Sequence, residues 1–74
     1  MTVRFSSLLD IKDFVGIVTS QPYDVRVDDG DHCVNARSFM EMCTLDFQKP
    51  LRIETDAPEN EVSLARIATQ FIAS

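Results

Sequence analysis

Three residue types in this sequence could carry chemistry. His32 is the only histidine, and an imidazole can accept a phosphoryl group or bind a metal ion. Cys33 and Cys43 could act as nucleophiles if a neighbouring base or cation activated the thiol. Ser38 could accept a phosphate, or its hydroxyl could cap the start of a helix. The residues around each of these side chains decide between such roles and structural ones.

The surroundings of His32 and of the two cysteines favour structural roles. His32 follows the acidic turn 28–31, whose carboxylates would repel a phosphoryl donor, so we expect a residue at the start of a strand. With few further ligands nearby, the sequence predicts neither a metal site nor a cofactor. Cys33 and Cys43 form no C-x-x-C pair and have acidic surroundings, so we expect reduced, non-catalytic thiols rather than a disulfide.

Length and charge narrow the classes of partner. The chain has 74 residues, enough for one domain spanning 1–74, and a net charge of −5. Its seven basic residues are scattered singly, which argues against nucleic acid and against an anionic membrane surface as partners. The N-terminus has no long apolar run, so we expect a cytoplasmic protein without a signal peptide or membrane span.

The hydrophobic pattern predicts an α+β fold with the order β-α-β-β-α-β-α. Each predicted strand alternates apolar and polar residues, which is typical of an antiparallel sheet with one wet face. We therefore expect a four-stranded antiparallel sheet with three helices on one face. The predicted strands are residues 2–5, 23–28, 32–36 and 51–54, and the helices begin at Ser7, at Ser38 and within 56–60.

The first predicted helix starts at a possible cap and contains a glycine. Ser7 is expected to cap it, with Asp10 in the first turn. Its core-facing stripe is predicted to include Leu8, Ile11, Val15 and Val18. Gly16 interrupts the helix at a cost of about 1 kcal/mol relative to alanine, and we expect close packing against another element to explain it.

The second predicted helix carries more apolar side chains than one helix face can bury. Ser38 and Glu41 form an S-x-x-E capping box at its start. Met42 and Leu45 suit the core. The sequence leaves two interpretations of the rest: neighbouring loops cover them, or they form a protein-docking patch. The predicted patch residues are Phe39, Met40 and Cys43.

The last predicted helix has two neighbouring apolar stripes at helical spacing. One contains Val62, Ala65, Ala68 and Ile72, and the other contains Leu64, Ile67 and Phe71. Both stripes predict that the helix continues as far as Phe71 and Ile72.

Residues 34–40 begin as a strand and turn into a helix, with a basic residue, a serine and two apolar residues in succession. This segment, with Met42, Leu45 and Phe47 after it, resembles the histidine-containing phosphocarrier (HPr) family of the bacterial sugar phosphotransferase system. Residues 59–61 are similar to the acidic start of that family's last helix. The resemblance implies the HPr-like open-faced sandwich, which has the element order predicted above.

The start of the first helix departs from that family. Ser7 stands where the family has its phosphorylated histidine, Leu9 where it has an arginine, and Asp10 where it has a proline. Phosphoryl transfer needs a nucleophilic imidazole and cationic or N–H groups that hold the phosphoryl oxygens. The nucleophile and the arginine are both absent, and Asp10 would repel a phosphate. These three residues therefore mark a degenerate phosphocarrier site.

The resemblance thus implies a relative of a phosphocarrier that is not itself an enzyme. We expect a protein-binding or regulatory module whose partners include phosphotransferase-system components, docking at Phe39, Met40 and Cys43. The family adds regulatory phosphorylation as a second role for Ser38, beside capping. Two alternatives stay open: a phosphocarrier with an unconventional acceptor such as His32, and a small structural homodimer that uses the same patch.

Overall fold

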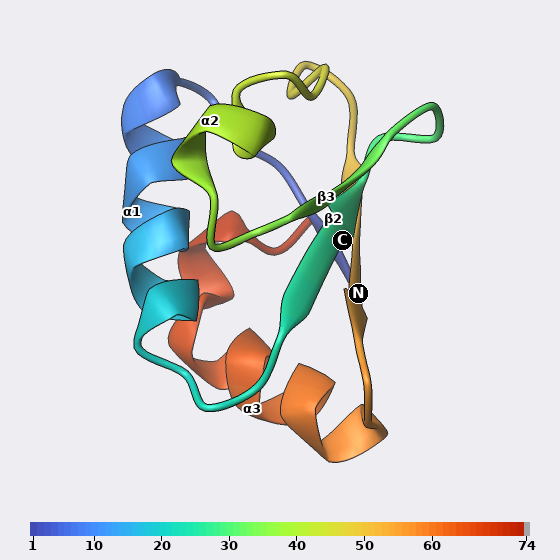
Figure 1. Ribbon diagram of the computed structural model, residues 1–74. Coiled ribbons are helices and arrows are strands. Elements are labelled where there is room, and N and C mark those ends of the chain that lie inside the picture. Colours follow the sequence, from blue (N-terminus) through green and yellow to red (C-terminus); the bar gives the residue numbers. More distant parts are fainter. Residues whose placement is uncertain (74) are drawn as a thin grey trace.

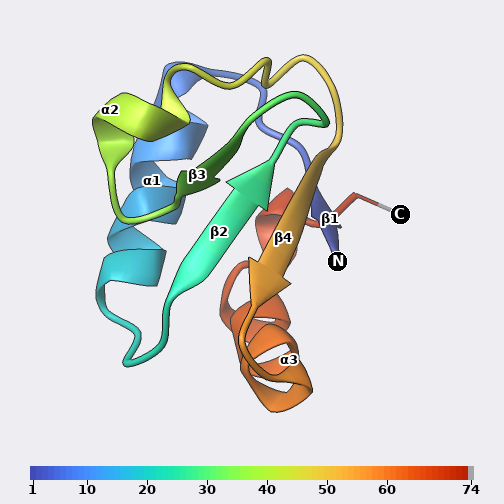
Figure 2. The ribbon, with the colours of Figure 1, turned by 45° about the vertical axis from the view of Figure 1, so that its right-hand side comes forward.

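The centre of the sheet is formed by two antiparallel strands, β2 (Val25–Asp28) and β4 (Leu51–Thr55). The computed structural model describes residues 1–73. β1 (Thr2–Val3) pairs with the outer side of β4, and β3 (Cys33–Asn35) pairs with the outer side of β2. The resulting order is β1-β4-β2-β3, with every pair antiparallel (Figure 2).

Side-chain alternation gives the sheet one apolar face and one polar face. Val25 and Val27 of β2 are fully buried, and Arg26 between them is exposed. In β4, Leu51 and Ile53 are buried while Arg52 is exposed. This alternation follows from the two-residue period of a strand, and it confirms the prediction that one face is wet.

Three helices cover the apolar face: α1 (Leu8–Thr19), α2 (Phe39–Met42) and α3 (Pro58–Ile67) (Figure 1). Beneath them, Phe5, Phe14 and Phe71 form an aromatic cluster with ring centroids 5.2 to 5.9 Å apart. The predicted open-faced α+β sandwich, with a four-stranded antiparallel sheet and three helices on one side, is confirmed. No helix within residues 1–73 has the length and apolar character needed to cross a membrane.

The end of the chain differs from the prediction. α3 ends at Ile67, and a short 3-10 helix (Thr69–Phe71) follows it. Ile72 then forms an antiparallel bridge with Val3, and the Arg4 N–H donates to the Phe71 carbonyl at 2.8 Å. The prediction of one long helix with two apolar stripes is therefore wrong. The chain turns back because β1 is the edge of the sheet, and its free backbone groups need partners.

Between Leu64 and Ile72, the pattern of buried and exposed residues agrees with a helix that ends at Ile67. Leu64, Ala68 and Phe71 are buried, whereas three of the residues predicted to line the stripes are exposed. These are Val62, Ile67 and Ile72, at 55%, 46% and 39%.

Gly16 also differs from the prediction. It lies on the exposed side of α1, and a Cβ atom placed on it would meet nothing within 4 Å. Close packing inside the fold therefore does not explain this glycine. Gly30, in contrast, has a φ angle of +99° in the β2–β3 turn, a conformation that glycine adopts without steric cost.

Candidate binding surface

The start of α1 holds the three residues of the predicted degenerate site. Ser7 is the N-cap residue, as predicted, but its side chain makes no capping hydrogen bond. Instead the Asp10 carboxylate reaches back and accepts hydrogen bonds from the Ser6 N–H at 2.8 Å and from its hydroxyl at 2.6 Å. The Ser6 hydroxyl, and then its N–H, lower the pKa of Asp10. The Ser7 hydroxyl therefore caps no N–H group of the helix, and the Asp10 carboxylate instead binds the residue before the N-cap.

This geometry puts an anion where a phosphoryl group would need a cation. The Asp10 carboxylate lies at the N-terminal end of α1, and Leu9 beside it is 70% exposed. His32 is not brought to this point, since it follows the β2–β3 turn, on the opposite side of the molecule from α1 (Figure 1). Its imidazole is largely exposed, with Nδ1 3.9 Å from an Asp29 carboxylate oxygen.

Ser38 begins α2 in the way the sequence predicts. Its hydroxyl accepts a hydrogen bond from the Glu41 N–H at 3.3 Å, which confirms the capping role. The reciprocal half of the predicted capping box does not form. The Ser38 N–H donates to the Asn35 carbonyl at 3.1 Å, so it needs no help from the Glu41 carboxylate. Regulatory phosphorylation of Ser38 stays a prediction.

The Asp29 carboxylate connects the turn between β2 and β3 to the loop after α2 through hydrogen bonds. Asp29 accepts hydrogen bonds from the N–H groups of Asp31 at 2.9 Å, His32 at 2.7 Å and Asp46 at 3.1 Å. The N–H of His32 makes the largest contribution to lowering the pKa of Asp29 to about 2. This contact fixes the loop that leads from α2 back to the sheet.

α2 exposes the side chains that the sequence assigns to a docking patch. Met40 is 79% exposed and Phe39 is 38% exposed, and Cys43 just after the helix is also exposed. Met42 and Leu45 are buried, as predicted. The helix is one turn long, so it can bury only one row of residues and turns the others outward.

Two further apolar residues extend this exposed area. Leu8 and Leu9 in the first turn of α1 are 52% and 70% exposed, so the prediction that Leu8 belongs to the core is wrong. α1 and α2 pack side by side (Figures 1 and 2), and the start of α1 lies at the same end of the molecule as α2 (Figure 1). We call this area the α1–α2 surface; its members are Leu8, Leu9, Phe39, Met40 and Cys43.

Sequence reasoning missed the contribution of α1, although a signal was present. That signal concerns Leu9, because successive helix residues lie about 100° apart and Leu9 therefore faces away from the core side of α1. Leu9 lies far from the buried Ile11 and Val18 around the helix. The spacing places Leu8 on the core side, so its exposure could not be predicted in this way.

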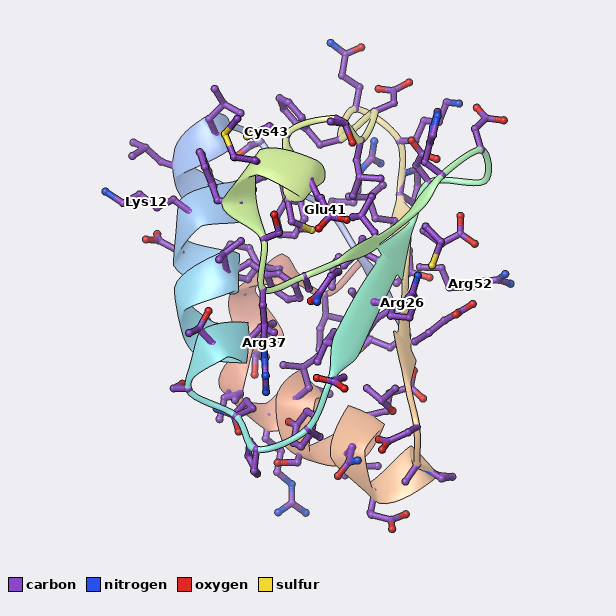
Figure 3. All side chains as sticks on the ribbon, in the orientation of Figure 1. Lys12, Arg26, Arg37, Glu41, Cys43 and Arg52 are labelled. Atoms are coloured by element: carbon purple, nitrogen blue, oxygen red, sulfur yellow. The ribbon has the colours of Figure 1, made fainter. Side chains whose placement is uncertain are left out.

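Two basic residues near the α1–α2 surface, Arg37 and Lys12, differ in whether they have hydrogen-bonding or ion-pair partners. Arg37, next to the helix cap, donates to the Gln21 carbonyl at 2.8 Å and the Tyr23 carbonyl at 3.1 Å, and also pairs with Asp24. Figure 3 shows it directed away from the α1–α2 surface. Lys12 on α1 is exposed and forms no ion pair or hydrogen bond with the other described residues.

The two cysteines lie on different elements and have different neighbours. Cys33 is exposed on β3, with its Sγ atom 3.4 Å from the Nε atom of Arg26. Cys43 belongs to the α1–α2 surface. Within residues 1–73 there is no group of three or more metal-ligating side chains.

Comparison with known proteins adds no assignment, since no family model, curated protein or solved structure matches the chain.

Proposed function

We propose that this chain is a cytoplasmic, HPr-like module that binds another protein through the α1–α2 surface and does not carry phosphate. The observation that carries the proposal is the cluster of exposed apolar side chains contributed by two packed helices. Monomeric proteins seldom leave adjoining apolar side chains exposed without a partner.

The chemistry at the start of α1 supports the non-carrier part of the proposal. A phosphoryl acceptor needs a nucleophile with nearby positive charge, and the Asp10 carboxylate supplies the opposite sign. We expect no phosphate adduct after incubation with phosphoenolpyruvate and the general phosphotransfer enzyme of the host. An intact mass measured under conditions that preserve phosphohistidine would detect such an adduct. If the adduct formed in the wild type and not in His32→Gln, His32 would be the acceptor.

The binding part of the proposal can be tested with a photo-crosslinking amino acid placed at position 40. We expect partner crosslinks from this position in living cells, identified by mass spectrometry. Position 62 on α3 is the matched control, because Val62 is 55% exposed and lies outside the α1–α2 surface. The same crosslinked proteins from both positions would show that the α1–α2 surface has no special role.

A second copy of this chain is the alternative occupant of this surface. Analytical ultracentrifugation of the wild type over a range of concentrations separates the two cases. A stable dimer that Met40→Ser dissociates would replace the partner proposal with a homodimer.

A further inference from the structure

The two edges of the sheet differ in how their backbone groups are used. At the β1 edge, the Arg4 N–H donates to the Phe71 carbonyl at 2.8 Å, and the Ala73 N–H donates to the Thr2 carbonyl at 2.9 Å. Residues 71–73 thus cover this edge as an added strand would. β3 forms the opposite edge, and no strand of residues 1–73 lies beyond it (Figure 2).

The register of β3 with β2 shows which of its backbone groups face outward. The Ala36 N–H donates to the Val25 carbonyl at 2.9 Å, so these two residues form a hydrogen-bonded pair of the ladder. Such pairs alternate along an antiparallel ladder, and Val34 therefore also faces β2. Cys33 and Asn35 lie between these positions, so their N–H and C=O groups point away from β2.

Most of these outward groups are free to bind a further strand. The Asn35 carbonyl accepts the Ser38 N–H at 3.1 Å. Within residues 1–73, no hydrogen bond of a turn, loop or cap uses the Cys33 N–H, the Cys33 carbonyl or the Asn35 N–H. Both residues are exposed, and β3 contains neither lysine nor proline, two residues that protect sheet edges from pairing.

We propose that β3 accepts an extended segment of another protein as a fifth strand, antiparallel to it like every other pair in this sheet. The residue opposite Cys33 would exchange two hydrogen bonds with it, and the Asn35 N–H would donate to a residue two positions away. Residues that pair with Cys33 and Asn35 lie on the polar face, and the residue between them lies beside Val34 on the apolar face. The segment therefore alternates polar and apolar side chains. This site shares no residue with the α1–α2 surface and goes beyond the proposed function.

The charged side chains around the β3 edge mostly have partners within the fold. The close pairs are Asp31 with Lys49 at 3.8 Å, Arg37 with Asp24 at 3.6 Å, His32 with Asp29 at 3.9 Å, and Arg26 Nε with the Cys33 sulfur at 3.4 Å. The Cys33 thiol raises the pKa of Arg26. The carboxylates of Glu54 and Glu41 add to this effect, so both lie near the same cation. Recognition therefore depends on backbone groups and on side-chain alternation rather than on charge.

A second copy of this chain fits the edge less well than a segment of another protein. A two-fold pairing of β3 with itself, centred on Val34, would place Cys33 opposite Asn35 of the other copy. Half of the resulting hydrogen bonds would need the Asn35 carbonyl, which already accepts the Ser38 N–H. Each copy also carries a net charge of −5, which opposes association.

The test uses a capped peptide of alternating threonine and valine, with a lysine at each end, and two N-methylated forms of it. When the threonines lie on the polar face, their N–H groups point to β3 and those of the valines point away. Methylation of the threonine amides should therefore weaken binding at least about tenfold, and methylation of the valine amides should change it by less than about twofold. Backbone amide shifts measure binding, and we expect the largest shifts at Cys33 and Asn35.

Position 33 offers a matched pair of variants. Cys33→Pro removes the outward N–H, and an edge strand tolerates proline where the missing N–H faces away from the sheet. Cys33→Ser keeps the N–H and controls for loss of the thiol. We expect Cys33→Pro to bind the unmethylated peptide at least about tenfold more weakly than Cys33→Ser. Circular dichroism checks that both variants fold, and the methylated peptides test the same contact on the wild type.

Three results would overturn the inference: equal binding of the two methylated peptides, no binding of the unmethylated peptide, or amide shifts confined to elements other than β3. A wild-type dimer in analytical ultracentrifugation that Cys33→Pro dissociates would overturn the choice of another protein as the occupant. Crosslinks specific to position 40 test the proposed function independently of all these results.

Discussion

Replacing Gly16 by alanine should stabilise this protein. Glycine in the interior of an exposed helix costs about 0.5–1 kcal/mol relative to alanine, because the unfolded chain has more backbone freedom to lose. The added methyl group meets no atom within 4 Å, so no clash offsets this gain. For a domain of 74 residues, about 1 kcal/mol corresponds to a rise in melting temperature of roughly 4–8 °C.

Gly30 is the matched comparison, since the same chemical change should have the opposite sign there. The Gly30 φ angle of +99° is one that alanine adopts only with strain. Its N–H also donates to the Asp28 carboxylate at 2.7 Å, which holds the turn in this conformation. Gly30→Ala should therefore destabilise the fold by about 1 kcal/mol or more.

Both variants are measured by urea denaturation and by thermal melts followed by circular dichroism. Equal slopes of unfolding free energy against urea would show that the two variants and the wild type unfold over the same surface. Loss of stability in Gly16→Ala would refute the reasoning, because it would mean that the Cβ position is not free or that this part of α1 is not helical. A neutral Gly30→Ala would remove the argument about the turn.

Three further predictions concern the cap, the turn and the α1–α2 surface. Ser38→Ala should cost about 1 kcal/mol in urea denaturation and Ser38→Asp less, and a Ser38→Ala variant as stable as wild type would remove the capping argument. Asp29 has a pKa of about 2, below the unfolded value near 3.9, so its contribution is present above about pH 4 and lost as the pH falls towards 2. The stability difference between wild type and Asp29→Asn should shrink over that range, and a pH-independent difference would contradict this. Phe39→Ser combined with Met40→Ser should weaken association with the partner more than it lowers the melting temperature, whereas a collapse of the melting temperature alone would assign both side chains to the core.

The sequence by itself determined the class of fold and the character of each central element. Val25 and Val27 alternate with polar residues, and this two-residue period is enough to predict a strand with one buried face. The position of Ser38 before an apolar run likewise predicted the start of α2 and its cap. These features depend on residues within one or two turns of each other, so the local pattern contains the information. The excess of apolar residues after Ser38 also predicted exposure of Phe39 and Met40.

The tertiary structure decided which distant residues meet. The pairing of Ile72 with Val3, and the contact of the Asp29 carboxylate with the Asp46 N–H, join segments that no local pattern relates. The addition of Leu8 and Leu9 to the α2 patch depends on how α1 packs against α2. Each of these features depends on residues far apart in the chain, so the local pattern of either segment does not contain it. The open face of Gly16 has the same origin: the sequence shows a glycine in a helix, and only the packed fold shows that nothing in it lies against this residue.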